Sequence, residues 1–398
     1  LFRMHILFLT QVLPYPLDAG AKVRAYYVLR YLALHHKVTL LSFVRDSDTS
    51  AAIEHLKEFC HAVHVVPIKR SRARNALFLA QSLVSSRPFL IQRDRVPEMF
   101  AAIKDTVSAA AQREEPFDAV HADQSWMADY ALYAKSISPP DHKPRTILDQ
   151  HNAVYMITRR LAGSEGNGAK LAFLALEERK LAKWEVETCA AFDHVTWVTE
   201  PDHYAVQEIA RKKNPGSVVR NDGIIPICGD PESIAPLAVG AQAKRVTFLG
   251  GMHYPPNAQG ILWYARTAFP HVLKEAPDAI LTVIGRQPPE ELQQLGIPPT
   301  NLDIAGYVDD PLPLLHETAV FVVPLLAGGG MRVKIVDALV WGLAIASTSI
   351  GAEGIALHHG INILLADEPE DLAEATLRLL KSPETRQNIA DAGRRWVL

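Results

Sequence analysis

A glycine-rich segment near the C-terminus carries residue types that suit a bound diphosphate. Residues 319–348 have the sequence AVFVVPLLAGGGMRVKIVDALVWGLAIAST, which predicts a strand, a turn, a helix and a second strand. Three consecutive glycines form the turn: Gly328, Gly329 and Gly330. Glycines let the backbone approach a ligand closely, and the start of a helix directs free N–H groups and a partial positive charge to the same point.

Two basic residues, Arg332 and Lys334, follow these glycines directly. Positive charges in the first turn of a helix oppose the helix dipole, so they destabilise the helix unless an anion binds there. Asp337 comes three residues later and is placed to accept a hydrogen bond from a sugar hydroxyl. The alternatives are solvated surface charges and an ion pair between Lys334 and Asp337. The position of the basic pair at a strand end favours a nucleotide diphosphate site.

Two histidines stand at the ends of predicted strands. His151, in LDQHNAV, is placed to hydrogen-bond a sugar hydroxyl or to shift a proton near neutral pH. Alternatively Asn152 caps the next helix and His151 is structural, and the sequence leaves both interpretations open. For His121, in FDAVHADQSW, the sequence favours a structural role.

Three further glycine loops follow predicted strands. Gly20 ends the loop QVLPYPLDAG before a helix, and Gly251 lies in GGMHYPPN, where Asn257 is the expected helix cap. The third loop, GYVDD, contains Gly306, Tyr307 and Val308, which we expect to lay backbone groups against a nucleotide base. Ordinary turns are the alternative in each loop, with Asp309 as the cap in the third.

These residues lie between apolar runs of strand length that alternate with helical patterns, which predicts parallel sheets with crossover helices. The first series of strands is His5–Thr10, Val38–Val44, Ala62–Pro67, Ala119–Ala122, Thr146–Asp149 and His194–Thr199. The second series is Val246–Gly250, Ala279–Gly285, Leu302–Ala305, Val320–Pro324 and Ala344–Ser347. The clearest helices are Ala21–His35, Met99–Gln112 and Ala169–Ala191. The chain is therefore predicted to be α/β, with two doubly wound Rossmann-like domains that face each other across a cleft.

Composition excludes several functional classes. A length of 398 residues predicts two domains, and a net charge of -3 argues against a nucleic-acid partner. Three distant cysteines indicate a reduced compartment, and no Cys/His cluster has metal-ligand spacing. The Asp46-Ser47-Asp48 triplet is better explained as a solvated loop than as a metal site. The N-terminus is no signal peptide, so we expect a cytoplasmic protein that begins naturally at Met4.

As a set, these segments resemble bacterial sugar transferases of glycosyltransferase family four, above all the subgroup associated with exopolysaccharide biosynthesis. The main motif VPLLAGGGMRVKIVDALVWGLAIAST is similar to the family signature Pl-x-x-GGGtRlKilEAlamGlPvVsT. PYPLDAGAKVRAYYVLRYLA, LDQHNAVYMITRR, FLGGMHYPPNAQGILWYA and GYVDDPLPLL match in kind and order.

The resemblance implies a GT-B fold and a retaining, metal-independent hexosyltransferase that needs no cofactor besides a donor nucleotide sugar of UDP or GDP type. In this family Arg332 and Lys334 would hold the diphosphate, and Asp337 would bind the ribose hydroxyls. Gly20 would lie over the phosphates, and His151 would face the donor sugar and the acceptor. The Gly306–Val308 turn would border the base.

The chain departs from the family pattern at three places. Asp337 replaces the family's Glu, which shortens the side chain by one methylene. The position eight residues earlier, a second Glu in many members, is Gly329 here, as is common in the glycine-rich subgroup. The chain also stops within a helix, GRRWVL, that we expect to be truncated.

We therefore expect an N-terminal acceptor-side domain (1–214), a hinge (215–243), a C-terminal donor domain (244–380) and a terminal helix (381–398). The acceptor would be a glycan or a lipid-linked sugar in polysaccharide biosynthesis. Residues 69–84 resemble a surface helix that could contact the inner face of the membrane, although a solvated surface is the more common explanation of such a pattern. A nucleotide-sugar epimerase and a non-catalytic nucleotide-sugar-binding subunit are the alternatives. The base, the sugar and the acceptor are not determined by the sequence.

Overall fold

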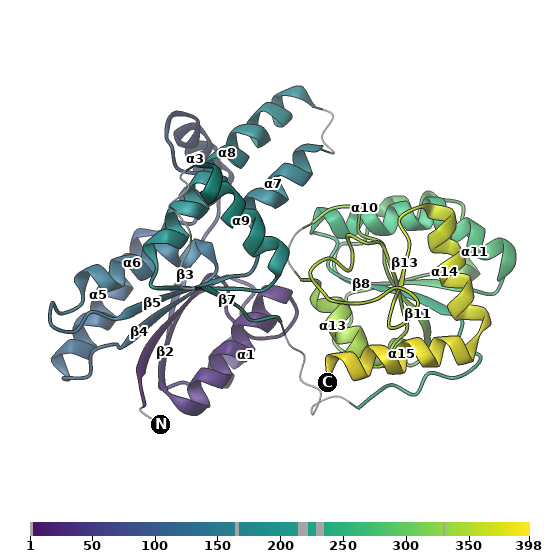
Figure 1. The fold of residues 1–398 in the computed structure, drawn as a ribbon, viewed down its shortest axis with the longest axis horizontal. Coiled ribbons are helices and arrows are strands. Elements are labelled where there is room, and N and C mark those ends of the chain that lie inside the picture. Colours follow the sequence, from purple (N-terminus) through teal and green to yellow (C-terminus); the bar gives the residue numbers. More distant parts are fainter. Residues whose placement is uncertain (1–2, 164–166, 214–221, 228–234, 329–330) are drawn as a thin grey trace. The chain divides into compact units, whose positions relative to one another are not determined.

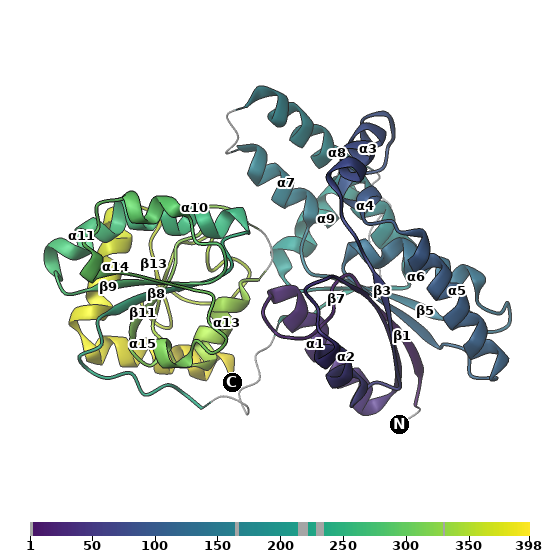
Figure 2. The ribbon, with the colours of Figure 1, turned by 180° about the vertical axis from the view of Figure 1, so that it is seen from behind.

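The computed structural model describes residues 3–163, 167–213, 222–227, 235–328 and 331–398. The chain forms two compact domains, Leu1–Ile227 and Cys228–Leu398. In each domain, helices cover both faces of one parallel sheet (Figures 1 and 2). The prediction of two doubly wound α/β domains is confirmed.

The N-terminal sheet has seven strands in the order β3-β2-β1-β4-β5-β6-β7. The strands are β1 His5–Thr10, β2 Lys37–Val44, β3 Ala62–Pro67, β4 Ala119–Asp123, β5 Arg145–Gln150, β6 His194–Trp197 and β7 Asp222–Ile224. Thr10 pairs with Asp123, and Asp123 pairs with Asp149, so the ends of β1, β4 and β5 are aligned. The chain order reverses between β1 and β4, the place where ligands collect in such sheets.

Nine α-helices are described in this domain: α1 Gly20–His35, α2 Ser50–Lys57, α3 Arg72–Val84, α4 Phe89–Arg93, α5 Pro97–Gln112, α6 Ala128–Ile137, α7 Val154–Gly163, α8 Gly168–Ala191 and α9 Glu200–Lys213. In Figure 2, α1 and α2 lie on one side of the sheet, and α5 and α6 on the other. The strands are apolar and buried on both faces, as Leu7, Phe8 and Leu9 of β1 illustrate. Two cores result, one on each face of the sheet.

The C-terminal sheet has six strands in the order β10-β9-β8-β11-β12-β13. They are β8 Arg245–Leu249, β9 Ile280–Ile284, β10 Leu302–Gly306, β11 Thr318–Val323, β12 Ile345–Ser347 and β13 Leu364–Leu365. The helices are α10 Pro255–Trp263, α11 Phe269–Glu275, α12 Leu312–Leu315, α13 Val333–Val340, α14 Pro369–Lys381 and α15 Pro383–Val397. In Figure 1, α10 and α11 lie on one side of this sheet, and α13 and α15 on the other. Its chain order reverses between β8 and β11.

All eleven predicted strands are present, with small shifts at their ends, and two short strands were missed. One of them, β7, lies inside the predicted hinge 215–243 and pairs with β6. The N-terminal domain therefore continues to Ile227 rather than ending at residue 214. Two other parts of that hinge, residues 215–221 and 228–234, lie outside the described residues. The expected terminal helix 381–398 corresponds to α15.

Among the described residues, no helix combines the length and the apolar character that crossing a membrane requires.

Candidate active site

Lys334 lies in the first turn of α13, and its ammonium group is enclosed by protein. Nζ donates a hydrogen bond to Asn257 Oδ1 at 2.9 Å and lies 4.3 Å from the centroid of the Phe248 ring. Burial, with a further contribution from the charge of Arg332, lowers the pKa of Lys334 to about 7. No carboxylate in the described part of the chain opposes this shift. Lys334 is thus a cation that an incoming anion would stabilise strongly.

Arg332 is the N-cap residue of α13 and is buried. Its Nη2 donates to the carbonyl of Ile350 at 3.5 Å. Gly328 passes close to the guanidinium: its φ is +135°, and a Cβ there would lie 2.9 Å from Arg332 Nη2. The first glycine of the predicted motif is therefore needed for its backbone conformation and for space. Gly329 and Gly330 lie outside the described residues.

Asp337 is half-buried in the middle of α13. Burial raises the pKa of its carboxyl to about 7. The alternative of an ion pair between Lys334 and Asp337 is wrong within the described structure, because the ammonium bonds to Asn257 instead. The helix thus presents a cation and a carboxyl group that do not neutralise each other.

Two glycines at neighbouring strand ends make close contacts near Lys334: Gly250 lies against the ammonium group, and Gly285 lies against the backbone of Gly250. A Cβ on Gly250 would lie 2.5 Å from Lys334 Nζ, and a Cβ on Gly285, whose φ is +145°, would lie 2.0 Å from the carbonyl oxygen of Gly250. Gly251, predicted to face the donor, accepts a hydrogen bond from Asn257 Nδ2 at 2.9 Å. The ends of β8 and β9 therefore touch directly beneath Lys334.

Asn257 was expected to cap α10, and this prediction is wrong. The N-cap residue is Tyr254, and Pro255 occupies the first helical position. Asn257 lies inside the helix, where its amide joins Gly251 to Lys334. The sequence did not reveal this contact with Lys334, although a proline at the first helical position is the signal that places the cap earlier.

The predicted base-binding turn follows β10, next to the end of its neighbouring strand β9. Gly306 has a φ of +65°, and its carbonyl accepts from Gly285 N at 2.7 Å, which ties the two strand ends together. Tyr307 is exposed, and the guanidinium of Arg286 lies 4.2 Å from its ring centroid. Val308 follows in the same turn. The N-cap residue of α12 is Pro311, and Asp310 Oδ1 accepts from Leu312 N at 3.0 Å, so Asp309 does not have the capping role of the alternative interpretation.

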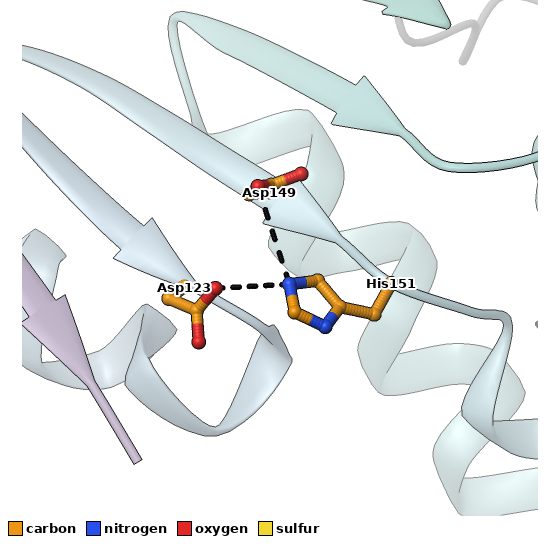
Figure 3. Close-up of side chains that lie close together, drawn as sticks. All are labelled: Asp123, Asp149 and His151. Atoms are coloured by element: carbon orange, nitrogen blue, oxygen red, sulfur yellow. Dashed lines mark hydrogen bonds and ion pairs between the residues drawn. The ribbon is translucent and has the colours of Figure 1, made fainter. Parts of the chain in front are cut away.

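His151 is held in a buried charge cluster of the N-terminal domain (Figure 3). Its Nε2 lies 2.9 Å from Asp123 Oδ1 and 4.0 Å from Asp149 Oδ2. Burial alone would lower the pKa of His151, but the charges of Asp123 and Asp149 outweigh it and raise the pKa above its ordinary value. His121 also borders the cluster, since its Nε2 lies 3.8 Å from Asp149 Oδ2, and its ring stacks on Phe8.

Arg24 of α1 neutralises Asp149. Its Nε and Nη2 donate to the two carboxylate oxygens, both at 3.0 Å, and Nη1 donates to the carbonyl of Pro226 at 3.0 Å. Burial would raise the pKa of Asp149, but His121 and Arg24 hold it well below its usual range. Arg24 was missed in the sequence. Its signal is a charged residue inside a buried stretch, between Val23 and Ala25.

The oxygens of Asp123 and Asp149 and a ring nitrogen of His151 lie within 4.8 Å of one another, a spacing that a metal ion could use. Both oxygens of Asp149 already accept from Arg24, and a guanidinium at this distance repels a second cation. The donor set therefore fits a hydrogen-bonded cluster better than a metal centre. At the Asp46–Asp48 triplet, Asp48 Oδ2 accepts from Arg45 N, as in an ordinary turn.

The loop after His151 is fixed by two other helices. Glu185 of α8 accepts from the amides of Val154 and Tyr155 at 2.8 and 2.9 Å, and Asp202 of α9 accepts from Ala153 N at 2.8 Å. These carboxylates bind the first amides of α7, the role expected for Asn152. Burial raises the pKa of Glu185 to about 7.

Gly20 is the first residue of α1, and Ala19 is its N-cap. It stands after β1, at the edge of the sheet that also carries His151, where the sequence placed it. The structure thus brings the predicted residues into two groups, each within one domain: Gly20 and His151 in the first, and the loops after β8, β10 and β11 with α13 in the second.

Comparisons with known proteins agree with this geometry. Residues 243–382 match the family described as glycosyl transferases group 1. A protein of Klebsiella pneumoniae, described as an uncharacterized 44.6 kDa protein in cps region, is 32% identical over 153 residues, which are 37% of this chain and 39% of that relative.

Solved structures resemble the whole chain at low identity. HepE of Anabaena in complex with UDP-glucose has a TM-score of 0.62 and 14% identity, with 99% of this chain and 94% of that chain covered. Sucrose-phosphate synthase of Thermosynechococcus elongatus has a TM-score of 0.65 and 14% identity, with the same coverage. Residues 243–382 are therefore similar to the glycosyl transferases group 1 family, and the chain has the fold of the GT-B glycosyltransferases.

Proposed function

We propose that this protein transfers a sugar from a nucleoside diphosphate sugar to a glycan or lipid-linked acceptor. The observation that carries the proposal is the enclosed ammonium of Lys334, whose pKa burial lowers to about 7. A group that loses its charge so readily needs an anionic ligand to keep it. Arg332 and the start of α13 add to the attraction for a diphosphate.

The remaining donor contacts follow from the strand ends of the same domain. Asp337 would accept hydrogen bonds from the ribose hydroxyls, and the Gly306–Val308 turn would border the base. We infer a nucleotide of UDP or GDP type, and the UDP and UDP-glucose in the HepE structures support the former. In the N-terminal domain, Gly20 would serve the phosphates, and His151 the transferred sugar and the acceptor.

The mechanism that these residues support is retaining and needs no metal or other cofactor. The bond between the anomeric carbon and the phosphate oxygen breaks, the acceptor oxygen forms its bond on the same face, and the departing phosphate takes the acceptor's proton. Arg332 and Lys334 stabilise the negative charge that develops on the leaving group, which is the largest electrostatic demand of this reaction.

We infer that the acceptor belongs to surface polysaccharide biosynthesis. The relative from Klebsiella pneumoniae, which is described as a protein in a cps region, supports this inference. Helix α3 supports a peripheral membrane contact, because Leu77, Leu83 and Val84 are exposed large apolar residues on one short helix. Lys69 and Arg70 precede that helix. We infer that residues 69–84 rest on an anionic membrane surface near a lipid-linked acceptor.

The test is a panel of nucleotide sugars, scored by thermal stabilisation and by release of the nucleoside diphosphate. We expect one donor to be turned over, and chelator to leave the turnover intact. Lys334→Ala and Arg332→Ala should each reduce donor binding at least about tenfold, since a charge-assisted hydrogen bond contributes ~1.5–3 kcal/mol. Lys244→Ala, which removes an exposed lysine of the same domain, is the matched control.

Three outcomes would contradict the proposal. If both variants bound the donor as tightly as the wild type, Arg332 and Lys334 would not bind the diphosphate. Nucleotide binding without release would indicate a binding subunit, and conversion of the sugar without an acceptor would indicate an epimerase. A strict requirement for a divalent cation would refute the metal-free mechanism.

A further inference from the structure

We propose that Asp123 is a positioning residue that acts through His151, holding the ring as an imidazolium that offers Nδ1–H to the ligand. This inference rests on the proposed function, because it assigns His151 the role of a hydrogen-bond donor during sugar transfer. The partner atom would be a hydroxyl or phosphate oxygen of the donor or the acceptor.

The first argument is the geometry of the ring. Nε2 faces both carboxylates, and Nδ1 lies on the other edge of the imidazole (Figure 3). Within the described residues, no protein group is hydrogen-bonded to Nδ1, whereas Nε2 is taken up by Asp123 at 2.9 Å. The only ring nitrogen left for a ligand is therefore Nδ1, and it carries a proton whenever the ring is charged.

The second argument is that the two aspartates have different hydrogen-bond partners. Asp149 accepts from Arg24 through both oxygens and from Thr196 through one, so its charge is already compensated. Asp123 is fully buried, receives its one side-chain hydrogen bond in the described structure from His151, and leaves Oδ2 without a partner. A buried carboxylate with one partner favours the cationic form of that partner strongly.

The charged groups around His151 come from three elements. Asp123 and His121 lie on β4, Asp149 lies on β5, and Arg24 lies on α1. Arg24 disfavours the imidazolium and the aspartates favour it, and the balance raises the pKa of His151. Because the folded-state pKa is raised, the charged ring is present below that value and is lost as the pH rises through it.

The first experiment needs no substrate. The imidazole of His151 is titrated by NMR in the full, ligand-free chain, with the resonance assigned through His151→Gln. We expect the wild-type pKa to lie above ~6.5, the ordinary histidine value, and to fall in Asp123→Asn, because the negative charge nearest the ring is lost. Asp118→Asn is the matched control, since it removes a His142–Asp118 contact of 3.2 Å at the other end of β4, and it should leave His151 unmoved.

The second experiment uses kcat at saturating donor, where the titration of Lys334 in the free protein does not enter. Activity should fall at high pH as the ring loses its proton, and Asp123→Asn should move this fall to lower pH by about the shift seen by NMR. The variant should lower kcat at least about tenfold at pH 8 with little change in the donor KM. Nucleotide binding should remain as in the wild type, and thermal unfolding should show that the variant is still folded at the assay temperature.

A double variant separates positioning from direct contact. If Asp123 acts only through His151, Asp123→Asn adds nothing to the loss caused by His151→Gln. A further loss in the double variant would mean that Asp123 touches the ligand itself and would overturn the inference. So would a wild-type His151 that titrates below ~6.5, or an Asp123→Asn variant with an unmoved pH profile. If the protein turns over no nucleotide sugar, the proposed function is wrong. The NMR titration still shows whether Asp123 raises the pKa of His151.

Discussion

Replacing Lys334 by Met should stabilise the ligand-free protein and abolish tight nucleotide binding. In the folded chain the pKa of Lys334 falls from 10.5 to about 7. At 1.36 kcal/mol per unit, enclosing the ammonium costs about 4 kcal/mol at pH 7. Methionine has a similar shape without the charge, so it removes this cost. It also loses the hydrogen bond to Asn257 and the contact with Phe248, together ~1–2 kcal/mol, which leaves a net gain of ~2–3 kcal/mol.

The sign of the pH dependence follows from the direction of the shift. Between pH 7 and 10.5 the unfolded lysine binds a proton that the folded one does not, so wild-type stability rises with pH through this window. The Met variant lacks this rise. Its advantage is therefore greatest at and below pH 7 and should shrink by roughly 1.4 kcal/mol for each pH unit above it.

The assay is urea unfolding of wild type and variant at pH 6, 7 and 8.5, followed by titration with a nucleoside diphosphate. The control is Lys244→Met, a change at an exposed ion pair with Asp278 that should shift stability by less than ~0.5 kcal/mol. A Met variant that is less stable than wild type at pH 7, or an advantage that is the same at pH 6 and 8.5, would refute the reasoning.

Three further changes test other parts of the structure. Burial raises the pKa of Asp337 from 3.8 to about 7, so the ionised carboxyl lowers the free energy of unfolding increasingly as the pH rises through this range. Asp337→Asn removes this loss. Urea unfolding should show that the variant is more stable than the wild type by up to ~4 kcal/mol at pH 8 and by almost nothing at pH 4. Gly285→Ala places a Cβ 2.0 Å from the Gly250 carbonyl at a positive φ, so it should lower the melting temperature by several degrees, and an unchanged value would contradict that packing. Arg24→Met leaves Asp149 buried without its cation and should cost ~3–5 kcal/mol at pH 7 but much less near pH 2, where a carboxylate can protonate.

The fold was predictable because buried parallel strands are continuous apolar runs, and such runs can be recognised directly in the sequence. The two missed strands are short: β7 contains the polar Asp222, and β13 has two residues. Neither has the length or the pattern of an isolated strand, and both are defined by pairing with a neighbour that is already in place.

The candidate site around α13 was predictable as a segment but not as a set of contacts. Arg332, Lys334 and Asp337 share one helix, so their spacing was visible in the sequence. The partners of these residues come from other strand ends, as Asn257 does at a separation of 77 residues. The local sequence predicted Asn257 as the cap of the following helix, but in the folded protein its side chain bonds to the distant Lys334.

The guanidinium of Arg24 is shared by two distant parts of the chain. It binds Asp149 next to His151, and it binds the carbonyl of Pro226, one residue before the N-terminal domain ends. The connection that leaves this domain is therefore tethered to the same cation that sets the electrostatic balance around the histidine. A displacement of Pro226 would release Arg24 from one of its two anchors, so a change at the end of this domain is expected to alter the proton affinity of His151.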